Sequence, residues 1–190
     1  VIINVLKVIK IIKMLSIISF INYSKFGLVN FLLLPFSAIF FVFSYIRLFL
    51  YKVRLLKVSV SSVPVIVIGN ITAGGTGKTP IVIAVANYFA SRNKIVGVVS
   101  RGYGGEYAQE SLEVTSKSDS IDCGDEPLLI KQQTEAFVVV AKKRSNAVKF
   151  LTENYPVDLI ISDDGLQHYA MGRDIEIAVI DGHNRLGNGW

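Results

Sequence analysis

Apolar runs alternate with polar or glycine-rich turns along most of the chain. Five runs of mainly branched apolar residues have the length of strands, at 65–68, 95–99, 137–140, 157–161 and 175–180. Continuous apolar runs of this kind are typical of strands buried on both faces of a parallel sheet. Stretches between them predict helices at 81–89, 128–133 and 142–154, the last with a solvated basic face. Strands that alternate with helices predict an α/β fold with a doubly wound, mostly parallel sheet.

The first strand runs into a glycine-rich segment. Residues 69–80 read Gly-Asn-Ile-Thr-Ala-Gly-Gly-Thr-Gly-Lys-Thr-Pro, and an apolar helical run follows. A strand, a glycine loop and a helix in this order form a P-loop, whose backbone N–H groups and helix N-terminus face a polyphosphate. Lys78 would reach the β- and γ-phosphates of ATP, and the Thr79 hydroxyl would ligate Mg²⁺. The sequence therefore predicts a P-loop NTPase-type fold.

The predicted nucleotide-binding residues form one continuous stretch. They are Thr72, Ala73, Gly74, Gly75, Thr76, Gly77, Lys78 and Thr79. Thr72 stands where the usual first glycine of the motif would be, so the loop must place a branched residue there. Pro80 suits the first turn of the helix, where its missing N–H costs nothing.

An acidic pair follows the strand expected at 157–161. An apolar strand that ends in aspartate delivers a carboxylate to the sheet edge beside Mg²⁺, and with a P-loop upstream this pattern is a strong signal. Asp163 and Asp164 are both candidates for the metal. Neighbouring side chains on a strand point to opposite faces, so both can reach the metal only if the strand has ended. Gln167 and His168 complete this turn, and His168 is as compatible with a structural role as with a functional one.

Two further segments lie where the carboxyl edge of the sheet is expected. Residues 100–105, Ser-Arg-Gly-Tyr-Gly-Gly, follow the second strand, and ligands of open α/β folds bind at this edge. The alternative for this segment is an ordinary flexible loop. Asp125 precedes the predicted helix at 128–133, and Pro127 fits its first turn. Asp125 can therefore be a helix cap, or a carboxylate held near the phosphates. Residues 111–120 are polar, with at most a short strand at 112–114.

The N-terminal part differs in composition from the rest. Residues 26–46 carry no charge and would make roughly 30 Å of helix, close to the thickness of a bilayer core. Pro35 would kink this helix or divide it in two. Arg47, Lys52, Arg54 and Lys57 follow at once, which favours a cytoplasmic location for that side.

Several interpretations of residues 26–46 remain. A cleaved signal peptide is disfavoured because it would export an ATP site. A single span, a helix lying in the membrane interface and a buried soluble helix are the alternatives. The proline and the basic residues favour partial insertion from the cytoplasmic face, as an apolar membrane-associating helix.

Composition narrows the class of protein. The chain has 190 residues, 51% of them hydrophobic, and a net charge of +5 that is concentrated early in the sequence. Scattered lysines without an aromatic platform argue against nucleic-acid binding. One cysteine, Cys123, excludes an internal disulfide and fits a reducing compartment. The first residue is Val1, and the sequence stops at Trp190 just after a strand-like run, so we expect a piece of a longer protein.

Together the motifs carry a family resemblance. The apolar N-terminus, the glycine-rich run at 69–80, Ser-Arg-Gly-Tyr-Gly at 100–104, Gly-Asp-Glu-Pro at 124–127 and Asp-Asp-Gly-Leu-Gln-His at 163–168 occur in this order. In this they resemble the tetraacyldisaccharide 4′-kinase family, the lipid A 4′-kinases of Gram-negative bacteria. Thr72 fits that family. The resemblance begins near residue 22, and residues before about 20 find no counterpart.

The resemblance implies an activity and a division of the chain. The activity is transfer of the ATP γ-phosphate to the 4′-hydroxyl of a tetraacylated disaccharide 1-phosphate, at the cytoplasmic side of the bacterial inner membrane, by a monomer. Residues 1–21 would be an extension, residues 22–60 a membrane-associating segment and residues 61–190 the kinase lobe. The resemblance also implies a second lobe beyond Trp190 with a histidine that pairs with the general base.

The resemblance also implies roles for single residues. Asp125 resembles the general base, and Lys78 and Thr79 hold the phosphates and Mg²⁺. Glu126 and the Asp163–Asp164 pair correspond to metal-site acids. Four residues match positions that face the sugar-phosphate acceptor, namely Arg101, Tyr103, Gln167 and His168.

The alternative function is a membrane-associated regulatory or partitioning ATPase of the deviant Walker type. Such proteins carry a lysine just before the paired glycines, and Ala73 occupies that position. A transporter ATPase would need a Leu-Ser-Gly-Gly-type signature, which the sequence lacks.

Overall fold

One six-stranded sheet organises the part of the chain that follows the N-terminal helix. The computed structural model describes residues 28–53, 55–70, 77–107 and 110–180. The strand order is β3-β4-β2-β5-β1-β6. Only β3 runs antiparallel to its neighbour β4, and the other pairs are parallel. The strands are β1 (Val65–Asn70), β2 (Val96–Ser100), β3 (Leu112–Val114), β4 (Phe137–Val140), β5 (Leu159–Asp163) and β6 (Ile175–Val179).

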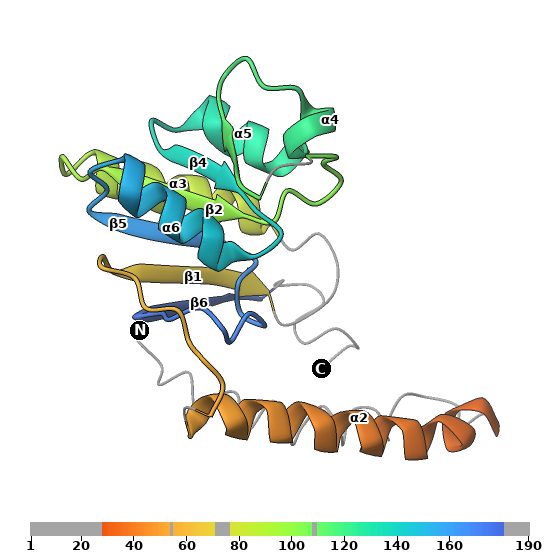
Figure 1. Cartoon of the computed structure of the whole chain (residues 1–190). Coiled ribbons are helices and arrows are strands. Elements are labelled where there is room, and N and C mark those ends of the chain that lie inside the picture. The colour runs from red at the N-terminus through yellow and green to blue at the C-terminus, as the bar shows by residue number, and fades with distance from the viewer. Residues whose placement is uncertain (1–27, 54, 71–76, 108–109, 181–190) are drawn as a thin grey trace.

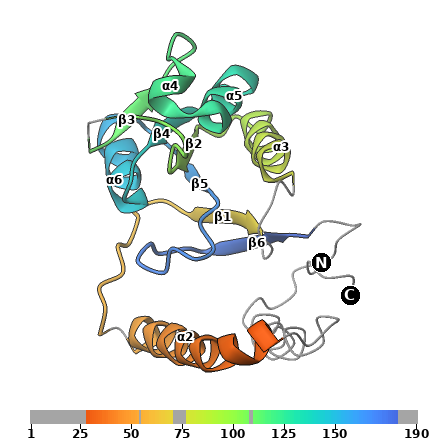
Figure 2. The ribbon, with the colours of Figure 1, turned by 90° about the vertical axis from the view of Figure 1, so that its right-hand side faces the viewer.

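Helices cover both faces of this sheet, as the doubly wound fold requires. Figure 2 shows α3 (Lys78–Ala90) and α6 (Arg144–Asn154) on opposite sides of the strands. Helix α5 (Asp125–Gln133) lies on the side of α3, after the single turn of α4 (Ser120–Cys123). The predicted helices and strands are therefore present, and the mostly parallel α/β sheet is confirmed.

The alternating side chains of β1 explain why its first four residues, 65–68, are all apolar. Ile66 and Ile68 belong to the core cluster on the side of α3, where Val82 is buried. Val65 and Val67 belong to the cluster on the other side, which contains Leu151 of α6. Because each face packs against a helix, the four positions from Val65 to Ile68 leave no room for a polar side chain, and the polar Asn70 stands at the carboxyl end of the strand.

Helix α2 (Leu28–Lys52) stands apart from the sheet in Figures 1 and 2. It continues through Pro35 as one helix, so the expected division in two is wrong, and Arg47 and Lys52 lie inside the helix instead of after it. A proline removes one backbone hydrogen bond, which the flanking turns of a long apolar helix can absorb. Among the described residues, no helix combines the length and the apolar character needed to cross a membrane.

The exposed face of α2 is strongly apolar. Phe36, Phe40 and Phe43 are 69%, 74% and 68% exposed. The interpretation of residues 26–46 as a buried soluble helix therefore fails for the side chains that the structure describes, because these rings have no protein cover.

The connection from α2 to β1 runs along the turn that follows β5. The Ser59 N–H donates to the carbonyl oxygen of Ala170 at 2.8 Å, and Gly172 N–H donates to the carbonyl oxygen of Ser59 at 2.8 Å. At the end of α2, the rings of Tyr51 and Tyr169 lie 6.0 Å apart. The helix is thus attached to the sheet domain through this turn.

Candidate functional site

The predicted site residues come from segments that meet at one edge of the sheet. Strands β1, β2, β4 and β5 are parallel, so their carboxyl ends lie at the same edge. Helices α3 and α5 begin at this edge, with their N-termini near the strand ends. A cluster of carbonyl-end loops and helix N-termini is the usual ligand-binding position of this fold, and it favours an anionic ligand.

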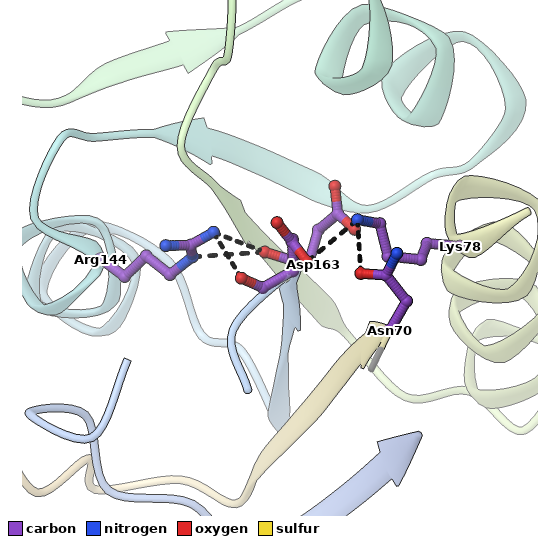
Figure 3. Close-up of polar contacts among 5 residues, drawn as sticks. Asn70, Lys78, Arg144 and Asp163 are labelled. Atoms are coloured by element: carbon purple, nitrogen blue, oxygen red, sulfur yellow. Dashed lines mark hydrogen bonds and ion pairs between the residues drawn. The ribbon is translucent and has the colours of Figure 1, made fainter. Parts of the chain in front are cut away.

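Lys78 is the first residue of α3 and already has two polar partners. Its Nζ donates to Asn70 Oδ1 at 3.1 Å and to Asp164 Oδ1 at 3.0 Å, as Figure 3 shows. The Lys78 side chain is 16% exposed, whereas that of Asp164 is 55% exposed. The ammonium group is therefore held at the end of β1, at the mouth of the site.

Asp163 is the most perturbed carboxylate of the site. It is the last residue of β5 and is buried. Burial, and then the negative charge of Glu126, raise its pKa to about 6, although Lys78 and Arg144 act in the opposite direction. Its Oδ1 is buried without a hydrogen-bond partner among the described residues. A carboxylate oxygen kept from water and from donors is suited to a cation ligand.

Strand β5 ends at Asp163, so Asp164 lies beyond the regular alternation of side chains along the strand. Asp164 has a φ of 51°, in the left-handed region that aspartate tolerates better than most residues. Because of this turn, the Asp164 side chain does not follow the alternating directions of the side chains in β5, and it reaches Lys78. The charge of Lys78 also acts on Asp163, where it opposes the rise in pKa that burial causes. Both acids therefore face the start of α3.

Arg144 fixes the end of β5. Its Nε and Nη2 donate to the carbonyl oxygen of Asp163 at 3.2 and 3.0 Å, and Nη2 donates to that of Asp164 at 2.8 Å. Burial lowers the pKa of this guanidinium, and the two aspartates offset part of that effect. The prediction of a solvated basic face for the helix at 142–154 is thus wrong at Arg144. This residue is buried and holds the backbone of the acidic pair.

The loop after β2 and the start of α5 pack backbone against backbone. Gly102 and Gly124 have φ angles of +64° and +88°. A Cβ on Gly124 would lie 2.7 Å from the carbonyl oxygen of Tyr103, and one on Gly102 would lie 2.9 Å from that of Cys123. The two motifs therefore form one unit, and the alternative of an ordinary flexible loop at 100–105 does not hold for this packed backbone.

Asp125 is the first residue of α5 and does not cap it. Gly124 takes the cap position, and no side-chain hydrogen bond is present there, so the interpretation of Asp125 as a helix cap is wrong. Pro127 lies in the first turn as expected. Asp125 and Glu126 are both exposed. Together with burial, the negative charge of Glu126 raises the pKa of Asp163, which indicates that this end of α5 lies near the acidic pair.

The remaining predicted site residues lie around the same edge. Arg101 and Tyr103 are exposed on the loop after β2, where the Tyr107 hydroxyl donates to the Arg101 carbonyl oxygen at 2.6 Å. Gln167 is exposed and His168 half-buried in the turn after β5. Burial lowers the pKa of His168, and Arg144 and Arg173 lower it further. This histidine is thus kept neutral in a positively charged environment.

Part of the predicted nucleotide site lies outside the described residues. Thr72, Ala73, Gly74, Gly75 and Thr76 belong to this part, while Gly77, Lys78 and Thr79 are described. Within the described ranges, no three His, Cys, Asp or Glu side chains lie close enough to hold a metal ion. A Mg²⁺ ion bound by Asp163, Asp164, Glu126 or Thr79 would therefore take most of its ligands from phosphates and water, as Mg²⁺ commonly does.

Two residues of this site, Asn70 and Arg144, have positions that no sequence motif predicts. Asn70 was visible only as part of the glycine-rich run, and the ladder of β1 places its amide beside Lys78. Arg144 carried no signal at all, because a basic residue at the start of a helix is ordinarily solvated. Only the tertiary fold brings it under the end of β5.

The chain is similar to known proteins over most of its length. The family model described as tetraacyldisaccharide-1-P 4′-kinase matches residues 29–190. A tetraacyldisaccharide 4′-kinase of Ruthia magnifica subsp. Calyptogena magnifica is 57% identical over 164 residues, which cover 86% of this chain and 52% of that protein. The corresponding protein of Actinobacillus pleuropneumoniae serotype 5b (strain L20) is 45% identical over 163 residues, covering 86% and 50%.

A solved structure agrees with these relatives. The crystal structure of LpxK from Aquifex aeolicus in complex with ATP has a TM-score of 0.69 and 33% sequence identity, and the match covers 77% of this chain and 47% of that one. The chain spans about half the length of the curated relatives that it matches.

Proposed function

Because the chain belongs to the tetraacyldisaccharide-1-P 4′-kinase family, we propose that its protein transfers the γ-phosphate of ATP to the 4′-hydroxyl of a tetraacyldisaccharide 1-phosphate, a step of lipid A synthesis. Phosphoryl transfer of this kind needs positioning and charge neutralisation more than covalent chemistry from the protein. The chain offers residues for each of these tasks.

The observation that carries the proposal is the setting of Lys78. Its ammonium lies at the N-terminus of α3, between Asn70 and Asp164 and beside the buried Asp163. The Asp164 carboxylate is an exposed partner of Lys78 that phosphate oxygens can replace. In the proposed complex, Lys78 exchanges this carboxylate for the β- and γ-phosphates, and residues 72–79 surround them.

The acidic residues fit a divalent cation. The Oδ1 atom of Asp163, which has no hydrogen-bond partner among the described residues, is the first candidate ligand. Asp164, Glu126 and the Thr79 hydroxyl are the further candidates that the sequence predicts. Bound there, Mg²⁺ would neutralise charge on the phosphates of ATP. Arg144 keeps the backbone of Asp163 and Asp164 in place while their partners change.

The acceptor side of the proposed site is formed by the loop after β2, the start of α5 and the turn after β5. Asp125 is exposed at the N-terminus of α5 and serves as general base, taking the proton from the 4′-hydroxyl as the phosphoryl group is transferred. Arg101, Tyr103, Gln167 and His168 would contact the sugar and its phosphate. Neutral His168 is suited to hydrogen bonding and not to a fixed positive charge.

We also propose that α2 holds the protein at the cytoplasmic side of the inner membrane. Its exposed phenylalanines and its basic C-terminal end fit the interface between lipid tails and anionic headgroups. An acceptor with several acyl chains stays in the bilayer, so its kinase must come to the surface. The attachment of α2 to the turn after β5 places this surface next to the acceptor residues.

The test uses the full-length protein in mixed micelles of detergent and the tetraacylated acceptor. Incubation with ATP should give a lipid heavier by one phosphate, which mass spectrometry detects. Lys78→Ala should abolish this product. Lys94→Ala is the matched control, because Lys94 also pairs with an aspartate, Asp158, at 3.3 Å, but sits at the amino end of the strands.

The outcomes separate the candidate classes. Equal activity of the Lys78→Ala and unmodified proteins would contradict the proposed phosphate site. ATP hydrolysis without any phosphorylated lipid would favour the regulatory ATPase class instead.

A further inference from the structure

One arginine, Arg173, bonds to three carbonyl groups of the turn after β5. We name residues 166–171 the acceptor loop, because it carries Gln167 and His168. Arg173 Nη1 donates to the Leu166 carbonyl oxygen at 3.2 Å, Nε donates to that of Met171 at 3.3 Å, and Nη2 donates to that of His168. One guanidinium thus bonds to the beginning, middle and end of the loop.

The charge of Arg173 is not available to a ligand. Its Nη1 also pairs with Glu176 Oε1 at 2.8 Å, and the two side chains are only 13% and 20% exposed. A phosphate ligand would have to displace a half-buried carboxylate and the loop carbonyls together. Arg173 therefore acts on the loop and does not bind the substrate.

The acceptor loop also joins the helix α2 to the site. The Tyr169 ring lies 6.0 Å from the ring of Tyr51, and the guanidinium of Arg47 lies 6.0 Å from its centre. Arg173 faces the same ring, at 5.8 Å. Tyr169 therefore lies between the arginine that holds the loop and the helix that we place at the membrane.

From these contacts we propose that Arg173 is a positioning residue for the lipid acceptor. It holds the acceptor loop so that Gln167 and His168 meet the sugar phosphate while Tyr169 keeps α2 beside the loop. The inference rests on the proposed function. An arginine is required because its planar guanidinium spreads five N–H donors over three nitrogen atoms and so reaches carbonyls at the beginning, middle and end of the loop. A lysine ammonium has three donors on one atom and cannot span the same set of carbonyls.

The variants are Arg173→Lys and Arg173→Ala in the full-length protein. Both should raise the KM for the lipid acceptor by at least about tenfold while the KM for ATP stays within about twofold, because only the acceptor side loses its geometry. Arg92→Ala is the matched control: its guanidinium bonds the Tyr88 carbonyl oxygen at 3.2 Å and lies over the Tyr88 ring, just beyond the C-terminal end of α3. It should change neither constant.

Hydrogen exchange gives a second readout that is independent of turnover. Amides 166–172 should exchange faster in Arg173→Lys, while those of α3 keep their wild-type rates. If Arg173→Ala fails to fold, Arg173→Lys decides, since it keeps the charge and the apolar stem.

Four results would overturn the inference. A wild-type lipid KM in Arg173→Lys would show that charge alone suffices. A parallel rise of both KM values, or faster exchange throughout the sheet, would show a general structural role. Absence of phosphorylated lipid from the unmodified protein would instead refute the proposed function, and the inference with it.

Discussion

Two adjacent aspartates differ in their surroundings and hence in their chemistry. Asp163 is buried, lacks a partner for Oδ1 within the described residues and has a pKa raised to about 6, mainly by burial. Asp164 is exposed and paired with Lys78. These surroundings suit different tasks. The buried carboxylate of Asp163, which is costly to ionise, suits metal binding. The exposed carboxylate of Asp164 suits the release of Lys78 to a phosphate group.

Asp163→Asn should stabilise the nucleotide-free protein at pH 8. The folded-state pKa of about 6 exceeds the ordinary value of 3.8. Between these values the folded state binds a proton that the unfolded state has lost, so the free energy of unfolding falls as the pH rises, and the cost is complete above pH 6. Asparagine removes this cost, which is on the order of 3 kcal/mol.

Urea unfolding in EDTA at pH 4 and pH 8 measures this effect. The gain in free energy of unfolding should be present at pH 8 and largely absent at pH 4. A loss of stability at pH 8 would mean that the Asp163 carboxylate has stabilising partners in the folded protein. The variant should also lose lipid phosphorylation.

Asp125→Asn should lower kcat by roughly 10²- to 10⁴-fold, the usual contribution of a general base, with little change in the KM for ATP. Because Asp125 makes no cap hydrogen bond, the melting temperature should not change. Steady-state kinetics and thermal unfolding of the full-length variant test both statements. A lower melting temperature with unchanged kcat would restore the helix-cap interpretation.

At the scale of elements, the acceptor side of the site depends on one close contact. The loop after β2 and the N-terminus of α5 touch through backbone atoms at Gly102 and Gly124, and Glu106 N–H donates to the Ile121 carbonyl oxygen at 2.9 Å. This contact sets the position of Asp125 relative to Arg101 and Tyr103. The glycines therefore matter for geometry as well as for folding.

Gly124→Ala should destabilise the protein by about 3 kcal/mol or more, because the new Cβ would meet the Tyr103 carbonyl oxygen and the backbone has φ +88° and ψ 155°. Gly104→Ala is the matched control. Gly104 has a similar φ of +85° but open space around its Cβ position, so only the backbone cost of about 1 kcal/mol remains. Equal losses in chemical denaturation would contradict the proposed contact.

At the scale of the whole molecule, the exposed apolar surface of α2 is not accounted for by packing against the sheet domain. The helix presents phenylalanines to solvent and meets the domain near Tyr169. A soluble domain gains nothing from such a surface. The arrangement suits a protein whose substrate stays in a bilayer, with the site held at a set height above it.

Replacing Phe36, Phe40 and Phe43 by serine should weaken binding to vesicles of anionic lipid by at least about tenfold, because each ring loses its apolar burial in the interface. The three positions share one face of α2. Ile121→Ser is the control, since Ile121 is 64% exposed on the sheet domain. Flotation of both variants measures binding, and unchanged binding of the triple variant would place the membrane contact elsewhere.

Several features could be predicted from the sequence because they depend on neighbouring residues. Strands β1, β2, β4, β5 and β6 follow from runs of branched apolar residues, and Lys78 follows from the glycine run between strand and helix. Even the position of Asp163 at a strand end is local. The lipid kinase family was likewise accessible, because its motifs are contiguous and ordered.

Other features were decided by contacts between distant residues. The roles of Arg144 and Arg173 depend on carbonyl groups that the fold brings to their guanidinium groups, and no local pattern distinguishes such arginines from solvated ones. The cap interpretation of Asp125 failed because Gly124, packed against Tyr103, already occupied the cap position. The sequence by itself determined which residues are candidates for the chemistry, since strand, loop and helix signals are short-range. Tertiary packing alone decided what holds those residues in place, since a buried donor takes whichever acceptor the fold presents to it.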